Sequence, residues 1–141
     1  MEPIQYLTIG EVELIAHRLA TELLELNEPI PPFSTRYPDV LERCIFSPQQ
    51  TFDKKDVYPN LYSKAAVLFY LMIKNHPFKN GNKRVAVTTL YLFLRKNSHT
   101  IEVDPGELFR LTFHVATSNA RLKDQTLKTI EEFIKKYSTK L

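Results

Sequence analysis

Two apolar segments of helical length stand close together in the chain, and they constrain its fold more than any other feature. Residues 61–75 carry apolar side chains on nearly all sides of the expected helix, as is typical of a central, buried helix. Residues 82–96 form a second apolar helix, which we expect Asn97 to end in a left-handed conformation. Only a short polar stretch joins the two segments, so the sequence predicts a helical core.

Further helices are predicted on both sides of this pair. Thr8 and Glu11 have the spacing of a capping box, and an apolar stripe follows them at intervals of three and four residues: Val12, Ile15, Leu19, Leu23 and Leu26. Helices are also expected from Pro38 to about residue 47, from residue 104 onward and over residues 124–137. Residues 48–60 are irregular and form either a loop or a short two-stranded flap. We therefore predict one all-α domain, residues 1–141, with about six helices and at most a small β flap.

Composition excludes several classes of protein. The 19 basic and 16 acidic residues leave a net charge of only +3, which gives no reason to expect nucleic-acid binding. Cys44 is the single cysteine, so no intrachain disulfide can form, and we expect it to be a buried apolar residue. The four histidines and this cysteine lack the spacing of zinc ligands. With neither a signal-peptide pattern nor a membrane-spanning segment, we expect a soluble cytoplasmic protein.

Glycine is scarce, and this restricts how the chain can bind phosphate. The three glycines, Gly10, Gly81 and Gly106, lie far apart. A P-loop, a dinucleotide-binding loop and a protein-kinase loop each need several glycines close together, so none of them can form here. A phosphate-binding site in this chain must therefore use another device.

That device is predicted at the start of the second central helix, in the stretch HPFKNGNKR, residues 76–84. The first N–H groups of a helix have no acceptor within it, and the helix dipole adds positive charge, so such an end binds anions. Lys83 and Arg84 in the first turn conflict with that dipole, a conflict that a bound polyphosphate would resolve. Gly81 lets the backbone approach a phosphate closely, and Asn82 can donate to a phosphate or cap the helix.

Two side chains before this helix complete the candidate site. His76 is suited to take up a proton near neutral pH. Phe78 is apolar within a polar stretch, so we expect it to anchor the loop in the core. Each of these signals is common by itself, and it is their ordered run that indicates a site.

The run HPFKNGNKR resembles the signature of the Fic/Doc family, H-P-F-x-[Asp/Glu]-G-N-[Gly/Lys]-R. The stretches TIGEVELIAHRL, YPNLYSKAAVLFYLMIKNHPF and VAVTTLYLFLRKN also resemble its Doc branch, whose members are toxins. The resemblance implies a mainly helical fold with a small flap near the active loop. It implies that His76 acts as the base on a hydroxyl of a target protein. Gly81, Asn82 and Arg84 would hold the phosphates of ATP or another nucleoside triphosphate.

Lys83 bears most on the type of reaction. This family position holds glycine in many AMP-transferring members and lysine in the Doc branch. The resemblance implies that the lysine turns the terminal phosphate toward His76, so that the target protein is phosphorylated. In Doc toxins that target resembles a translation elongation factor, and a small antitoxin protein restrains the activity.

Asn80 departs from the signature, which has an acid that binds Mg²⁺ at this position. An amide oxygen can still ligate Mg²⁺, but without negative charge, and Lys79 beside it weakens a cation site further. Either Mg²⁺ is held through phosphate oxygens, or the activity is low or altered.

Three other functions stay open. The same fold supports an AMP transferase. Loss of Mg²⁺ use through Lys79 and Asn80 would leave a non-catalytic binding module. A helical nucleic-acid binder would face DNA phosphates with Lys83 and Arg84, and the modest net charge argues against it.

Overall fold

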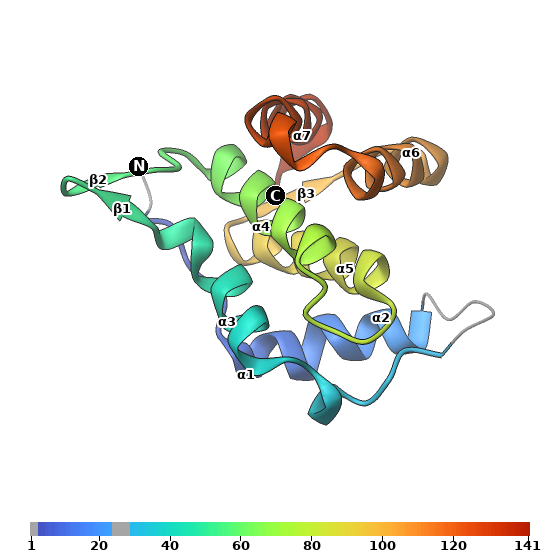
Figure 1. Ribbon diagram of the computed structural model, residues 1–141. Helices are drawn as coiled ribbons and strands as arrows, with labels where there is room; N and C mark the ends of the chain where they lie inside the picture. Colours follow the sequence, from blue (N-terminus) through green and yellow to red (C-terminus); the bar gives the residue numbers. More distant parts are fainter. Residues whose placement is uncertain (1–2, 24–28) are drawn as a thin grey trace.

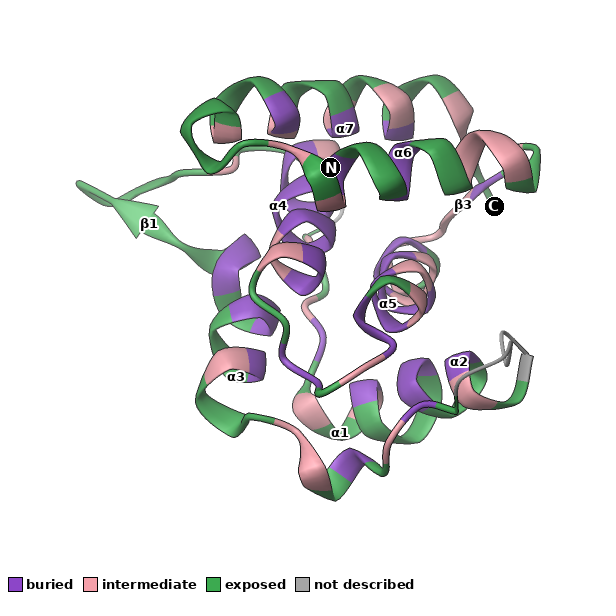
Figure 2. Cartoon of the chain, turned by 45° about the vertical axis from the view of Figure 1, so that its right-hand side comes forward, coloured by how far each residue is buried: buried purple, intermediate pink, exposed green. Residues whose placement is uncertain are grey.

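The computed structural model describes residues 3–23 and 29–141, and within them the chain is mainly helical, as the sequence predicts (Figure 1). The two central helices, α4 and α5, lie side by side in the middle of the fold. Helices α6 and α7 cover them on one side, and the N-terminal helix and α3 lie on the other (Figures 1 and 2). No helix in the described ranges is long and apolar enough to cross a membrane. The bounds of these helices are Pro38–Phe46 for α3, Leu61–Lys74 for α4, Asn82–Lys96 for α5, Pro105–Thr117 for α6 and Lys123–Tyr137 for α7.

Helix α4 forms the centre of the core. Its side chains are buried on nearly all sides, from Ala65 to Tyr70 without a break (Figure 2). A reciprocal cap starts the helix: Asn60 Oδ1 accepts from the Ser63 N–H at 2.9 Å, and Ser63 Oγ accepts from the Asn60 N–H at 3.1 Å. Because α4 ends two residues before His76, the core fixes where the candidate loop begins.

The N-terminal helix is continuous but changes its hydrogen-bond pattern. It runs through α1 (Ile9–Glu11), π-helical turns (Val12–His17) and α2 (Arg18–Leu23). The predicted capping box is present: Thr8 Oγ1 accepts from the Glu11 N–H at 3.1 Å, and Glu11 Oε1 accepts from the Thr8 N–H at 2.9 Å.

The predicted apolar stripe of this helix was only partly right. Val12 is buried, but Ile15 and Leu19 are 40% and 37% exposed. Small residues are buried in their place: Ala16 and Ala20. The i→i+5 turns of a π-helix are wider than α-helical turns, so the buried positions recur here every four residues. The side chains of the last two stripe positions, Leu23 and Leu26, lie outside the described part of the chain.

The irregular stretch after α3 contains a small flap, one of the two structures that the sequence left open. Strands β1 (Thr51–Phe52) and β2 (Lys55–Asp56) pair antiparallel, and the two residues between them have positive φ values of 53° and 65°. A two-residue turn of this kind matches the twist of a hairpin. The Val57 N–H donates to Gln50 O at 2.9 Å and closes the base of the flap.

A second two-stranded sheet was not predicted. Strand β3 (His99–Ile101) pairs antiparallel with β4 (Ser138–Lys140), which places the end of the chain beside the segment after α5. The prediction for Asn97 was wrong, because its φ is −105° and Ser98, with a φ of 63°, takes the left-handed position. Asn97 instead uses its side chain to donate to Gln5 O at 2.9 Å and to accept from the Gln5 N–H at 2.7 Å.

Cys44 lies in the core, as the sequence predicts. The cysteine is fully buried in α3, and burial raises the pKa of its thiol to about 12. The thiol therefore stays protonated near neutral pH and does not act as a nucleophile.

Candidate active site

His76 lies at the surface, just beyond the end of α4. The last hydrogen bond of that helix runs from the Asn75 N–H to Leu71 O at 2.9 Å, and His76 then adopts a left-handed conformation with a φ of 50°. Pro77 contributes to this, because a proline disfavours helical geometry in the residue before it. A left-handed non-glycine residue costs on the order of 1 kcal/mol or more, and such residues cluster at functional sites. The backbone therefore holds an exposed imidazole at a strained turn.

Phe78 anchors the loop after the histidine in the core. This side chain is only 2% exposed and packs against the rings of His17 and Phe33, with centroid distances of 5.4 and 5.9 Å. The Tyr37 N–H also donates to Pro77 O at 2.9 Å, which fixes the start of α3 to the loop. Contacts from three separate parts of the chain thus hold the loop in one conformation.

Asn82 opens α5 and binds the backbone of the loop with both ends of its amide. Its Oδ1 accepts from the Phe78 N–H at 2.9 Å, and its Nδ2 donates to Phe78 O at 2.8 Å. The same Nδ2 lies 3.4 Å from Nδ1 of His76. That contact is too long to fix which ring nitrogen carries the proton. The Asn82 side chain shapes the loop, while its backbone N–H belongs to the first turn of α5.

Gly81 caps α5 in a left-handed conformation, with a φ of 78° and a ψ of 14°. A side chain here would collide with the core, because an ideal Cβ would lie 2.7 Å from Ile30 Cγ1. Gly81 O accepts from the Val85 N–H at 3.0 Å, which begins the hydrogen bonds of the helix. Both the backbone conformation and the close approach of Ile30 therefore require glycine at this position.

The first turn of α5 carries positive charge and no acidic residue. Lys83 is exposed and Arg84 is half-buried. The N–H groups of a first turn have no acceptor within the helix, and the helix dipole adds partial positive charge. Five of the residues predicted from the sequence thus lie around one helix start: His76, Gly81, Asn82, Lys83 and Arg84. Such an arrangement can bind an anion beside an imidazole.

The surroundings of Asn80 test whether the protein could build a Mg²⁺ site. Asn80 is half-buried, between the exposed Lys79 and the buried Gly81. In the part of the chain that the structure describes, no three His, Cys, Asp or Glu side chains gather in a way that could hold a metal ion. Asn80 itself offers a neutral oxygen, whereas carboxylates are the usual protein ligands of Mg²⁺. These residues do not fit a Mg²⁺ site built by the protein.

Lys64 joins the flap to α4, a role that the sequence did not predict. The residue is 1% exposed, yet its ammonium donates to Pro48 O at 3.0 Å and to Asp56 Oδ2 at 3.2 Å. Its Nζ also lies 5.5 Å from the centre of the Tyr6 ring. The signal in the sequence was a single lysine near the start of an otherwise apolar helix, because lysine is almost never fully buried unless it is paired.

His17 is a second buried polar residue that supports the loop and was not singled out. It is 8% exposed, and its Nε2 lies 3.0 Å from Pro31 O. Burial lowers the pKa of His17, although the hydrogen bond to Pro31 and the charge of Glu13 act in the opposite direction. The neutral imidazole therefore donates from Nε2 and packs its ring on Phe78.

Fold and site together define a helical domain that presents an exposed histidine beside a helix start that carries Lys83 and Arg84. The chain belongs to the Fic/DOC family, whose sequence profile matches residues 6–94. That range includes the N-terminal helix, the flap, α4, the candidate loop and nearly all of α5.

The chain is similar to Toxin Doc from Mycolicibacterium smegmatis, with 35% identity over 65 residues. The similarity covers 46% of this chain and 50% of the toxin. The chain therefore spans about half the length of that relative.

Proposed function

We propose that this chain is a Doc-like toxin that transfers the terminal phosphoryl group of a nucleoside triphosphate, such as ATP, to a hydroxyl of a target protein. The observation that carries this proposal is the exposed, left-handed His76 directly before a helix start that bears Lys83 and Arg84. Phosphoryl transfer requires mainly that the reacting groups are positioned and that the charge on the phosphate oxygens is neutralised. A helix start with two cations beside a base can do both. The similarity to Toxin Doc supports the same conclusion.

In the proposed reaction, a ring nitrogen of His76 takes the proton of the target hydroxyl. The hydroxyl oxygen forms a bond to the γ-phosphorus, and the bond from that phosphorus to the β–γ bridging oxygen breaks. The nucleoside diphosphate leaves with the electron pair, and His76 releases its proton to solvent. The target then carries a phosphate monoester.

Four residues are proposed to hold the phosphates. Gly81 lets a phosphate approach the helix start because it has no Cβ. The first-turn N–H groups and the cations of Lys83 and Arg84 offset the negative charge of the triphosphate. The side-chain amide of Asn82 is hydrogen-bonded to the backbone of Phe78, so it holds the loop conformation and does not face the phosphates. Asn82 would contact a phosphate through its backbone N–H.

The first test compares the wild-type chain with His76→Ala and with a control, His114→Ala, which replaces an exposed histidine on α6. Each protein is incubated with ATP, MgCl₂ and a bacterial lysate, and modified proteins are identified by intact mass. The wild type and the control are expected to add phosphate to a target. His76→Ala is expected to be slower by a factor of about one hundred or more, the usual contribution of a general base. Transfer by His76→Ala at the wild-type rate would refute the proposal.

AMP transfer is the second candidate, because the same site could present the α-phosphorus to the attacking hydroxyl. Intact mass separates the two reactions, since the target gains either one phosphate or one AMP group. Lys83 favours phosphorylation through the resemblance to the Doc branch. Lys83→Gly is expected to slow phosphorylation, and it tests whether this side chain decides which phosphorus faces His76.

A non-catalytic binding module is the third candidate, favoured by Lys79 and Asn80 where an acidic metal site would otherwise stand. Calorimetry with ATP and MgCl₂ distinguishes it from the enzyme. Binding accompanied by transfer supports the enzyme, whereas neither binding nor transfer supports the module.

On the strength of the Doc resemblance, we further propose that the target is a translation factor and that a separate antitoxin protein restrains the activity. Growth arrest on expression of the chain, relieved by co-expression of the protein encoded beside it, would support this. A purified chain that is inactive alone, and that a point mutation elsewhere in it activates, would contradict the need for a separate antitoxin.

A further inference from the structure

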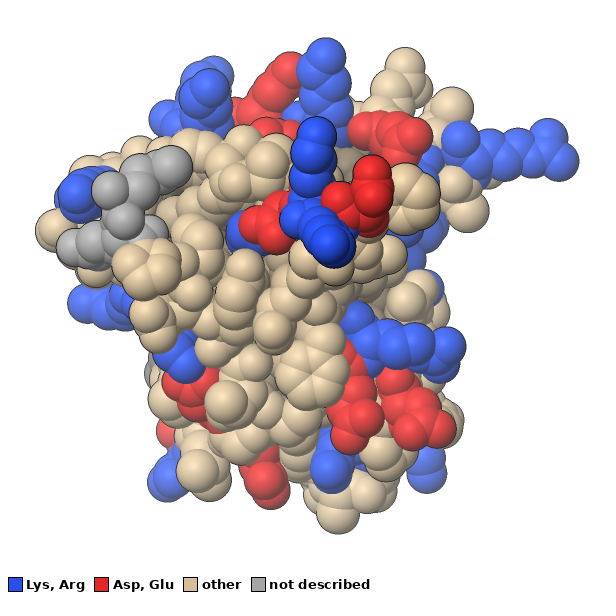
Figure 3. All heavy atoms as spheres, turned by 90° about the vertical axis from the view of Figure 1, so that its left-hand side faces the viewer, with Lys and Arg blue, Asp and Glu red and all other residues tan. Residues whose placement is uncertain are grey.

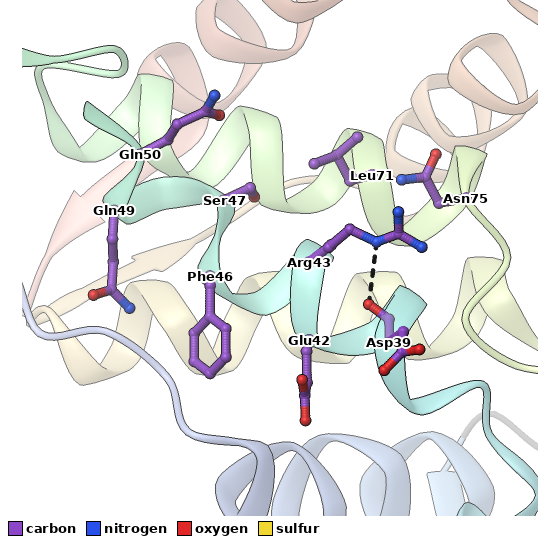
Figure 4. A pocket seen from close by; sticks show the side chains of 9 residues that line it. All are labelled: Asp39, Glu42, Arg43, Phe46, Ser47, Gln49, Gln50, Leu71 and Asn75. Atoms are coloured by element: carbon purple, nitrogen blue, oxygen red, sulfur yellow. Dashed lines mark hydrogen bonds between the residues drawn. The ribbon is translucent and has the colours of Figure 1, made fainter. Parts of the chain in front are cut away.

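An open groove lies over α3 and the turn that follows it, and it reaches the candidate active loop (Figure 4). Its volume is about 720 Å³. Asn75, at the end of α4, borders the groove on one side, and Gln50, next to the flap, borders it on the other. Because neighbouring Cα atoms are about 3.8 Å apart, the groove comes within one residue of His76.

Hydrogen bonds fix this groove relative to the loop. At the start of α3, the Tyr37 N–H donates to Pro77 O at 2.9 Å. Beyond the other end of α3, the buried ammonium of Lys64 donates to Pro48 O at 3.0 Å. A segment bound along α3 would therefore lie at a defined distance from His76.

The charges in the groove favour a polypeptide over a nucleotide. Asp39 and Glu42 are exposed carboxylates on α3, and neither forms an ion pair with a described residue. Arg43 also lines the groove, where its Nε donates to the backbone oxygen of Asp39 at 3.2 Å. Two carboxylates and one guanidinium leave the groove with a net negative charge, which disfavours a triphosphate and favours the side chain of a lysine or arginine.

The groove also offers apolar contact. Phe46 is 48% exposed and projects to the same side of α3 as Glu42 (Figure 4). Leu71 of α4 adds a second apolar side chain to the lining. Seen from the side of the flap, the surface of the molecule has uncharged areas between groups of charged side chains of both signs (Figure 3). A partner with one basic and one apolar side chain matches the lining of the groove.

We propose that the groove binds the segment of the target protein that carries the accepting hydroxyl, with a basic side chain against Asp39 and Glu42 and an apolar side chain against Phe46. The inference rests on the proposed function and adds a preference for particular residues around the accepting hydroxyl of the target. The nine residues of α3 span about 13 Å, a length that about four extended residues cover. With the acceptor at His76, the basic residue lies within about two positions of it and the apolar residue about three or four positions away.

A library of peptides tests this sequence preference. Each peptide contains one serine or threonine, each flanking position is fixed in turn, and transfer is measured with γ-³²P-labelled ATP and MgCl₂. The wild type is expected to prefer lysine or arginine close to the acceptor and an apolar residue further along. The double variant Asp39→Lys/Glu42→Lys is expected to modify the lysine-containing peptides about fivefold less efficiently and to prefer acidic ones.

Matched controls separate the groove from general effects of substitution. Glu131→Lys/Glu132→Lys makes the same change of charge on α7 and is expected to keep the wild-type preference. Phe46→Ser is expected to lose the preference for an apolar residue, whereas Phe113→Ser, at a residue that is 57% exposed on α6, is expected to keep it. Calorimetry is expected to show unchanged ATP affinity in all four variants, which also establishes that each one folds.

Several results would overturn the inference. One is a wild type that labels all peptides equally, or that labels lysate proteins but no peptide. Another is a charge-reversed variant whose preference does not change. Loss of ATP affinity in the groove variants alone would make the groove part of the nucleotide site. Absence of transfer by the wild type to peptides and lysate proteins alike would instead refute the proposed function, and this inference with it.

Discussion

The side-chain amide of Asn82 and the backbone of Phe78 form two hydrogen bonds, of 2.9 and 2.8 Å, across the turn between α4 and α5. Asn82 is 9% exposed and Phe78 is 2% exposed, so both bonds are shielded from water. A buried backbone group without a partner is costly, and here one side chain satisfies both groups of a loop residue. The shape of the candidate loop therefore depends on this pair before any ligand binds.

Asn82→Ala is expected to lower the free energy of unfolding by about 2 kcal/mol, because it leaves the N–H and C=O of Phe78 without partners. Urea denaturation measures this change. Asn75→Ala replaces an exposed asparagine at the end of α4, and this control is expected to stay within about 0.5 kcal/mol of the wild type. Equal stability of the two variants would show that the loop is held by other contacts.

Lys64→Met is expected to loosen the flap, because Pro48 O and the Asp56 carboxylate lose their shared donor. Hydrogen exchange at the Val57 amide, which donates to Gln50 O, is expected to quicken by about tenfold. Asp56→Asn keeps an acceptor for Lys64 and is expected to have a smaller effect. If exchange at Val57 does not change in Lys64→Met, the hairpin holds itself and the lysine is not its anchor.

Stability is expected to fall as the pH drops below about 6.5, the usual pKa of an unfolded histidine. Burial lowers the pKa of His17 in the folded protein, so the unfolded chain binds more protons between the two pKa values, and acid favours unfolding there. Urea midpoints at about pH 7.5 and about pH 5.5 measure the effect on either side of that value. His17→Gln can still donate to Pro31 O and is expected to reduce the difference. A pH dependence that is identical in the variant would assign it to other groups.

The native Cys44 thiol is expected to resist a thiol reagent at about pH 8, because burial raises its pKa to about 12 and keeps the reagent out. Reaction with dithionitrobenzoate, followed by absorbance, is expected to be slow in buffer and rapid in guanidinium chloride. Rapid labelling of the folded chain would contradict the burial of α3 against the core.

Gly81→Ala is expected to lower the free energy of unfolding by about 2 kcal/mol, from the left-handed backbone and from contact with Ile30. Ile30→Ala is destabilising by itself, but it removes the atom that the new Cβ would meet. The two substitutions together are therefore expected to cost about 1 kcal/mol less than their sum. Strict additivity in this double-mutant cycle would contradict the close contact.

The parts of the fold that could be predicted are those encoded locally. Thr8 and Glu11 specify the first helix through side chains three residues apart, and the structure confirms that cap. The two central helices have the predicted bounds to within about one residue, since unbroken apolar runs and flanking polar residues mark their ends. The order of residues in the candidate site was also visible, because it lies within one continuous stretch.

The remaining features depend on partners far away in the sequence. Lys64 is satisfied by Pro48 and Asp56, which no periodicity relates to it. Strand β3 forms only because the end of the chain returns beside it. Asn82 could have capped the helix or faced a phosphate, and only the position of Phe78 decides which groups its amide binds.

The contact between Ile30 and Gly81 also limits how this loop can change over generations. A new side chain at position 81 meets an unfavourable backbone and the Ile30 side chain at once. The backbone penalty stays whatever residue stands at position 30, but the steric penalty falls in a lineage where position 30 has already become smaller. The order of the two substitutions is thus constrained, and a segment outside the signature helps to decide which versions of the signature can arise.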